Sequence, residues 1–352
     1  MIQRSIRFSF ALILLGISAA GSASAQYHYG GARRGGGSYG EQGIYFILEG
    51  MTQNVRNADA VVATTESSQN FGGGVNVLNP VLPDWDDEFT GRLGVGYRWA
   101  GGSKLSGSFW AFESTQRASG NGPVGGFLHF AVGPPIRTGG GFVGNVASPG
   151  FYDASTEISA STADIAWAKI QEVSDRFGVE WSLGLRYATF EETTTGVYDE
   201  AASSDAAFGA VRYDARKSNE GTMIGARAGI RGSYRFLSSF SASTGLAFSV
   251  LDGELEASST LSPTGTVNSA TVPTAAVAFS DDGRSGHTLD FDVQLAWHSS
   301  SDTFKVWLGW EQSRWEGIAA DLVRNFPGTT APLRDRDAVT FSGYKVGIRF
   351  GF

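Results

Sequence analysis

The sequence of 352 residues contains no cysteine, which excludes disulfide bonds and metal sites with cysteine ligands. It also lacks an apolar run long enough for a membrane helix. The longest, from Phe8 to about Ala20, falls short of the roughly 18 to 20 residues that cross a bilayer. Basic residues are fewer than acidic ones, 27 against 35, so nucleic acid is not an expected partner.

Motifs for catalysis are missing as well. The chain has four histidines and contains no His-Glu-x-x-His helix and no Gly-x-x-x-x-Gly-Lys phosphate-binding loop. We therefore expect no enzyme activity and no cofactor. The chain is rich instead in glycine and aromatic residues, with 48 glycines, 24 phenylalanines and 9 tryptophans. This composition is typical of β-strands with aromatic side chains at a membrane interface.

The first residues have the pattern of a secretory signal peptide. Two arginines precede the apolar run, and the small residues Ala23 and Ala25 form a cleavage site. We predict that residues 1–25 are removed on export. The mature chain would then begin with a flexible, glycine-rich periplasmic tail at residues 26–42.

Residues 43–352 alternate apolar and polar side chains in segments typical of β-strands. In the clearest segment, residues 88–99, large apolar residues take every second position, while arginine and glutamate lie between them. Residues 177–191 and 222–236 repeat the pattern. Seven further segments are weaker: residues 43–55, 103–115, 156–173, 239–254, 286–299, 303–315 and 339–352. The sequence thus predicts ten strands, each bounded to within a few residues.

The predicted connections alternate in length. Four are tight, whereas the five between them run to roughly twenty to forty residues. Outer-membrane barrels have short periplasmic turns, long extracellular loops and an even number of strands. We therefore predict an all-β protein, a transmembrane antiparallel up-and-down β-barrel in the outer membrane of a Gram-negative bacterium. Residues 124–130 and 206–213 could extend strands or form a further hairpin, which would give twelve strands.

The two faces of the predicted strands differ in chemistry. One face is aliphatic, with tyrosine and tryptophan near strand ends, and would meet lipid and its headgroups. The other carries charges of both signs. Its candidate pore-lining residues are Arg92, Glu180, Arg186, Arg227, Arg231, Asp290, Asp292, Lys345 and Arg349. Two interpretations stay open: a salt-bridged core that fills the barrel, or a water-filled path whose basic side chains bias the choice of solute.

Three segments carry a resemblance to a known family. Residues 84–99, 184–187 and 343–352 resemble the Legionella-type major outer-membrane, pore-forming proteins, and the likeness spans most of the mature chain. The family uses cysteines in places and this chain has none, so no disulfide carries over.

The resemblance implies an outer-membrane porin. It also implies that the terminal Phe352, with Tyr344 and Phe350 on the same strand face, is the signal that the barrel-assembly machinery recognises. Outer-membrane lipid and lipopolysaccharide are the other expected partners, and a homo-oligomer is an option.

The first functional expectation is a porin that passes small hydrophilic solutes by diffusion. Arg92, Arg186, Arg227 and Arg231 would then line its constriction and tune its charge preference. The alternative is a non-conducting surface protein, an adhesin or structural anchor, that acts through its five long loops. The sequence favours the porin without excluding the surface protein.

Two further groups of residues could carry chemistry. His287 lies close in sequence to Asp281, Asp282 and Asp290, and an acid–histidine pair at the rim could activate water in a hydrolase. The acidic segment at residues 84–88 could hold a divalent cation through oxygen ligands, but its spacing is not that of a calcium loop. We expect neither a catalytic site nor a metal site.

Overall fold

The computed structural model describes the barrel and parts of its loops: residues 42–56, 63–67, 77–81, 85–121, 127–130, 136–138, 141–143, 145–147, 150–200, 211–264, 266–267, 270–271, 274–299, 303–318, 320–322, 333–335 and 338–352. The predicted signal peptide, with Ala23 and Ala25, lies outside these residues, as does the predicted tail up to Glu41. Every regular element in the described part of the chain is a β-strand. The described part of the chain holds no helix that could cross a bilayer.

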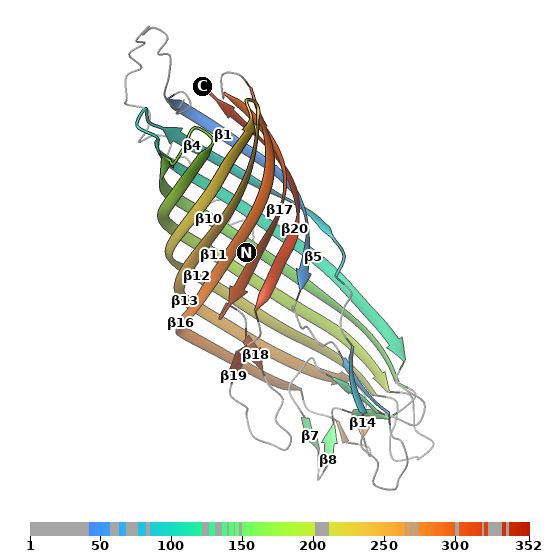
Figure 1. Cartoon of the computed structure of the whole chain (residues 1–352). Helices are drawn as coiled ribbons and strands as arrows, with labels where there is room; N and C mark the ends of the chain where they lie inside the picture. Colours follow the sequence, from blue (N-terminus) through green and yellow to red (C-terminus); the bar gives the residue numbers. More distant parts are fainter. Residues whose placement is uncertain are drawn as a thin grey trace.

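Ten strands form a closed antiparallel barrel (Figure 1). They are β1 (Gly43–Arg56), β4 (Glu88–Arg98), β5 (Ser103–Asn121), β10 (Gly150–Glu172), β11 (Phe177–Glu200), β12 (Val211–Leu237), β13 (Phe240–Thr264), β16 (Ala275–His298), β17 (Phe304–Glu316) and β20 (Val339–Gly351). Each strand pairs with its neighbours in this order, and β1 pairs with β20, with Leu48 opposite Ile348, to close the ring. The ten predicted strands are confirmed. The hairpin that would have given twelve strands is not part of the barrel, because Phe127–Phe130 joins a separate sheet and residues 211–213 begin β12.

The two ends of the barrel differ. At the turn end, tight turns join the paired strands, and Gly43 and Gly351 lie here. In the first turn, Gly102 has a φ of 76°, a conformation that favours glycine, and its N–H donates to the carbonyl of Trp99 at 3.0 Å. At the opposite loop end, the chain makes its long connections.

Short strands lie on the loop-end side, past the ends of the short barrel strands (Figure 1). One sheet joins β2 (Ala63–Ser67), β3 (Val77–Val81), β6 (Phe127–Phe130) and β9 (Asn145–Ala147); three two-stranded sheets pair β7 (Ile136–Thr138) with β8 (Gly141–Val143), β14 (Thr266–Val267) with β15 (Ala270–Thr271), and β18 (Ala320–Leu322) with β19 (Leu333–Asp335). Among them, β9 lies against β11 and β18 lies against β13.

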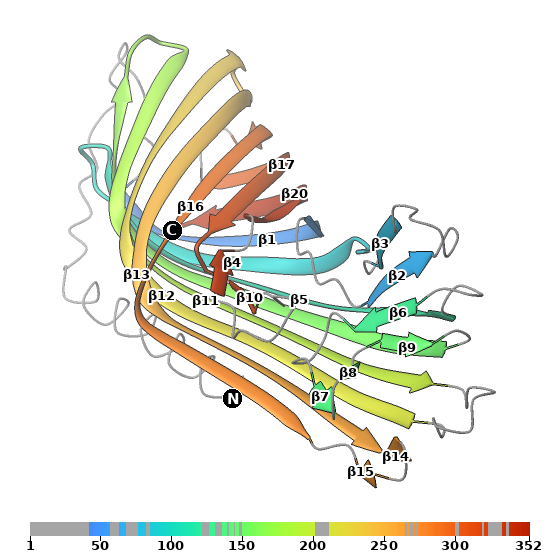
Figure 2. The ribbon, with the colours of Figure 1, turned by 90° about the horizontal axis from the view of Figure 1, so that it is seen from below.

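The barrel wall is taller on one side. Strands β10 to β13 and β16 have 23 to 27 residues, whereas β1, β4, β17 and β20 have 11 to 14. Figure 2 shows the long strands curving past the ends of the short ones. The predicted bounds were therefore right at the turn end, but wrong at the loop end of the long strands. Residues predicted as loop, such as those from 192 to 200, continue the strand.

An apolar band surrounds the turn-end half of the barrel on its outside. The side chains that form it are exposed aliphatic and aromatic residues on successive strands, among them Phe46, Leu48, Leu93, Leu105, Ile165, Trp167, Trp181, Leu183, Leu185, Ile224, Ile230, Leu246, Phe248, Leu289, Leu295, Leu308, Val346 and Phe350. An exposed apolar surface of this extent around a closed barrel is what lipid covers. The lipid-facing prediction from strand parity agrees with this placement.

The polarity of the wall reverses toward the loop end. On β11, Tyr187 still faces outward, but Phe190 faces inward and is 1% exposed. On β13, Val250 faces outward and the next residue, Leu251, is buried inside. The outward positions beyond this level carry polar groups such as Glu191. The loop-end half thus resembles a water-soluble barrel, apolar inside and polar outside, because water replaces lipid as its surroundings.

Candidate functional site: the barrel interior

A cavity of about 490 Å³ occupies the turn-end half of the interior. It reaches from the turn at Ser174–Phe177 to the inward-facing rings of Trp110 and Trp315. All nine residues that the sequence predicted to line a pore lie on its wall: Arg92, Glu180, Arg186, Arg227, Arg231, Asp290, Asp292, Lys345 and Arg349. Strand parity positions them, since each faces inward on its strand.

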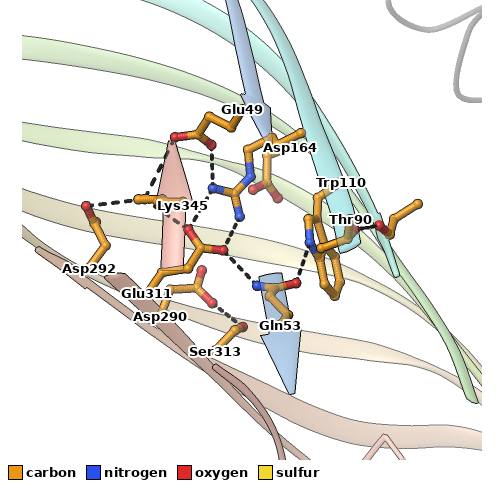
Figure 3. Close-up of polar contacts among 12 residues, drawn as sticks. Glu49, Gln53, Thr90, Trp110, Asp164, Asp290, Asp292, Glu311, Ser313 and Lys345 are labelled. Carbon is orange, nitrogen blue, oxygen red and sulfur yellow. Dashed lines mark hydrogen bonds and ion pairs between the residues drawn. The ribbon is translucent and has the colours of Figure 1, made fainter. Parts of the chain in front are cut away.

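The deep part of the cavity contains a charged layer of ten residues with equal numbers of both signs. They are Glu49, Asp164, Asp290, Asp292, Glu311, Arg92, Arg186, Arg227, Arg231 and Lys345. Figure 3 shows six of them, Glu49, Asp164, Asp290, Asp292, Glu311 and Lys345, which come from β1, β10, β16, β17 and β20. Because it has five charges of each sign, the layer carries no net charge. Its ion pairs at hydrogen-bond distance offset the free-energy cost of burying these charges.

Glu311 is the centre of one half of this layer. It accepts hydrogen bonds from both terminal nitrogens of Arg92, at 2.9 and 3.0 Å, and from Lys345 Nζ at 2.9 Å (Figure 3). Arg92 also donates to Glu49 at 2.9 Å. Lys345 is 4% exposed, and its Nζ lies 3.6 Å from a carboxylate oxygen of Asp292, so it is neutralised from more than one side.

Arg186 and Arg227 form the other half with two aspartates. Arg186 donates to both carboxylate oxygens of Asp164, at 2.7 and 2.8 Å, and its Nη1 lies 2.8 Å from Asp290. Arg227 donates to Asp290 at 3.0 Å. Arg231 stands outside this group and donates to Asp292 at 2.8 Å. All four arginines predicted at a constriction are therefore held by carboxylates.

An apolar layer crosses the interior directly beyond the charged layer. Its fourteen buried side chains come from eight barrel strands and the segment after β17: Met51, Val55, Trp110, Phe112, Ile158, Ala160, Ala188, Phe190, Met223, Leu251, Trp315, Ile318, Val339 and Phe341. The Phe341 ring lies 5.2 to 5.3 Å from the rings of Trp110, Phe112 and Trp315, centroid to centroid. In this conformation the apolar layer closes the lumen. Neither interpretation left open for the inner face, a salt-bridged core or a water-filled path, included this apolar layer.

Two tryptophans tie the apolar layer to the charged layer. Trp110 donates its indole N–H to Gln53 at 3.0 Å, and Gln53 donates to Glu311 at 3.1 Å. Trp315 donates to Ser313 at 2.7 Å, and Ser313 donates to Asp290 at 2.6 Å. A shift of either ring would break a hydrogen bond to the charged network, so the two layers are mechanically linked.

The sequence missed these linking residues for a clear reason. Gln53 and Ser313 are uncharged and ordinary in a strand, so only their inward parity could have marked them. Glu49 and Trp307 were also missed; the Trp307 indole N–H donates to Glu49 at 2.9 Å, and both lie on segments where the predicted strand pattern was weaker.

His287 lies on the outer face of the barrel, away from the interior. It faces outward beside Phe248, and its Nε2 lies 2.7 Å from Glu316, which also pairs with Arg314. Asp290 faces the opposite way, into the cavity. His287 therefore does not pair with Asp290, one of the three aspartates near it in sequence, and its carboxylate partner is Glu316 on the next strand.

Within the described residues, no three histidine or acidic side chains come together as metal ligands. Of the acidic segment at residues 84–88, Asp84 lies outside the described residues, and Glu88 accepts a hydrogen bond from Ser114 at 3.4 Å.

No protein-family model matches the chain, and no curated protein matches it. Its fold is similar to solved outer-membrane barrels. The outer-membrane protease OmpT from Escherichia coli is 11% identical, with 88% of this chain and 97% of that chain covered and a TM-score of 0.43. The toluene transporter TodX from P. putida is 9% identical over 90% of this chain and 91% of that chain, with a TM-score of 0.32. OprG from Pseudomonas aeruginosa is 11% identical over 88% and 98%, with a TM-score of 0.29. At this level of similarity, no function is transferred from these proteins. The evidence for the barrel is the strand pairing of the chain itself.

Proposed function

We propose that the protein is an outer-membrane, porin-like barrel that passes small hydrophilic solutes through its interior when the apolar layer moves aside. The observation that supports this most directly is the polar cavity of about 490 Å³ inside the barrel, which ends at the apolar layer. Charged side chains and hydroxyls on its wall can replace the water around a small solute.

The proposed orientation follows from the two ends. We place the tight turns and both ends of the barrel chain in the periplasm and the long connections at the cell exterior, as in other outer-membrane barrels. Outer-membrane lipid and lipopolysaccharide would contact the apolar band, with the residues beyond it in water. We also propose that Tyr344, Phe350 and Phe352, which lie on the outward face of β20, are read by the barrel-assembly machinery.

Conductance in planar lipid bilayers tests the proposed path. We expect the unaltered barrel to show rare, brief openings. Phe341→Ala removes a ring at the centre of the apolar layer and should raise the conductance or the open fraction. Leu308→Ala on the lipid-facing side is the matched control and should leave the current unchanged. Folded barrels that carry no current, both unaltered and with Phe341→Ala, would refute the channel.

The closed apolar layer also favours a second candidate, a non-conducting surface protein. Its working part would be the long connections at the loop end, next to a wall whose outward positions carry Glu113, Glu157, Glu191, Glu220 and Glu256. Binding to host cells or extracellular matrix by loop-deleted variants separates the two candidates. A surface protein should lose its binding, whereas a porin should not depend on the loops for conductance.

A further inference from the structure

The cavity has an excess of positive charge at its turn end. The mouth is defined here as the nine charged residues that line the cavity in the turns or near the strand ends beside them. Six are basic, namely Arg98, Lys104, Arg176, Arg235, Lys305 and Arg349, and three are acidic, namely Glu172, Asp175 and Glu180. The charged layer behind the mouth holds five charges of each sign, so it does not offset this excess.

Composition does not explain the positive mouth. The chain as a whole has a formal net charge of −8, yet the charged residues around this cavity sum to a positive value. The carboxylates that produce the negative total lie mainly elsewhere, as in the outward row Glu191, Glu220 and Glu256, which stand opposite one another on three adjacent strands. Charge is thus separated between the inside of the turn end and the outside of the loop end.

The contacts at the mouth leave this excess in place. Lys104 lies 2.7 Å from Glu180, and this pair removes one charge of each sign, so the excess of three positive charges is unchanged. Arg176 and Arg235 start from neighbouring backbone, because the N–H of Arg235 donates to the carbonyl of Arg176 at 2.7 Å. Both residues are exposed and line the cavity. Two guanidinium groups that begin side by side can both contact one oxyanion.

We infer that the mouth selects small oxyanions, carboxylates or phosphates, which enter the cavity from the turn end. This inference rests on the proposed function for the path, although the binding of the anion needs only the cavity. The serine hydroxyls of Ser106, Ser108 and Ser243 also line the wall and can donate to oxyanion oxygens. A low-dielectric wall around an excess of positive charge raises the local concentration of anions.

The selecting groups are therefore Arg176 and Arg235, the two neighbouring, exposed arginines of the mouth. Arg92, Arg186, Arg227 and Arg231 are held by carboxylates in the charged layer, so their field is largely cancelled locally. Replacing these deeper arginines should affect folding more than ion selection. Replacing mouth residues should do the reverse.

Reversal potentials in a KCl gradient give the first test, using the purified full-length barrel and its Phe341→Ala variant. We expect chloride to be favoured over potassium by roughly two- to tenfold at low salt, with the preference shrinking as the Debye length falls toward about 3 Å at 1 M. Arg235→Glu should bring the ratio to about one or below it. Arg212→Glu is the control, because Arg212 is 54% exposed at the loop end and pairs with the exposed Asp214. A potassium preference, or equal effects of the two variants, would overturn the inference.

Calorimetric titration with sodium citrate, potassium phosphate and spermine gives the second test, and it does not need current. The two anions should bind to the unaltered protein and more weakly, by at least several-fold, to Arg235→Glu. Spermine should not bind to the cavity. Anion binding without any current would support anion selection by the mouth and refute the proposed channel. Current without anion binding or anion preference would support the channel and refute anion selection.

Discussion

The charged layer makes one prediction that can be worked through in detail. Glu311 accepts four hydrogen bonds, two from Arg92 and one each from Gln53 and Lys345. Glu311→Gln keeps the shape of the side chain but leaves the buried Lys345 and the half-buried Arg92 short of one negative charge. Breaking a buried pair in this way costs about 3–5 kcal/mol of unfolding free energy. Lys345→Met should cost a similar amount, since it leaves three carboxylates within 4.0 Å without their shared cation.

The double variant decides whether the layer acts as one network. Both partners are then absent, so the combined loss should be smaller than the sum of the single losses by about 1–3 kcal/mol. Urea unfolding of the barrel in lipid vesicles, followed by tryptophan fluorescence, measures all three values. The exposed pair Arg314 and Glu316 on the outer face is the control, and its removal should cost less than about 1 kcal/mol. Additivity of Glu311→Gln and Lys345→Met to within about 0.5 kcal/mol would refute the network.

Three further predictions concern other parts of the barrel. Leu185→Arg, in the apolar band, should lower the unfolding free energy in vesicles by roughly 2–4 kcal/mol, whereas Thr195→Arg, outward on the same strand beyond the band, should change it by less than about 0.5 kcal/mol. Burial, with the opposed Glu220 adding, raises the pKa of Glu191, so the folded barrel holds this proton more tightly than the unfolded chain. Stability should therefore fall as pH rises from the ordinary carboxyl pKa through the raised one, and Glu220→Gln should lessen that fall and stabilise the barrel by roughly 0.2–1 kcal/mol at pH 7 in urea titrations. Deletion of Phe352 should reduce the amount of barrel assembled in cell outer membranes but should shift the urea midpoint of refolded protein little; equal amounts in membranes would contradict the assembly signal.

Strand parity was enough to predict the turn-end half of the barrel. There, lipid outside and charge inside keep one pattern along each strand, and tight turns such as the one at Gly102 mark where the strands begin. The inward position of the predicted pore-lining residues followed from the same rule. Part of their pairing follows from the hairpin register, since Asp164 stands directly opposite Arg186. The contacts of Arg92 with Glu311 and of Arg186 with Asp290 could not be predicted, because they join strands that are far apart in sequence and are not neighbours in the sheet.

The loop-end half was missed for a physical reason. A search for one constant pattern stops where water replaces lipid, since the apolar residues then change faces. On β11, Tyr187 is outward and Phe190 is inward, and the predicted strand ended at residue 191 while the actual strand continues to Glu200. The same change of faces placed Trp110, Phe112 and Phe341 in the lumen, and this is why the apolar layer was not foreseen.

The reversal of polarity along the wall is the claim on which the membrane position, the closed lumen and the proposed path all depend. Because the chain has no cysteine, single cysteines can be placed at outward positions of β11 without side reactions. Labelling with a water-soluble maleimide in sealed lipid vesicles should be slow at 183, 185 and 187 and fast at 193, 195 and 197. Labelling at residue 185 as fast as at residue 195 would contradict the account.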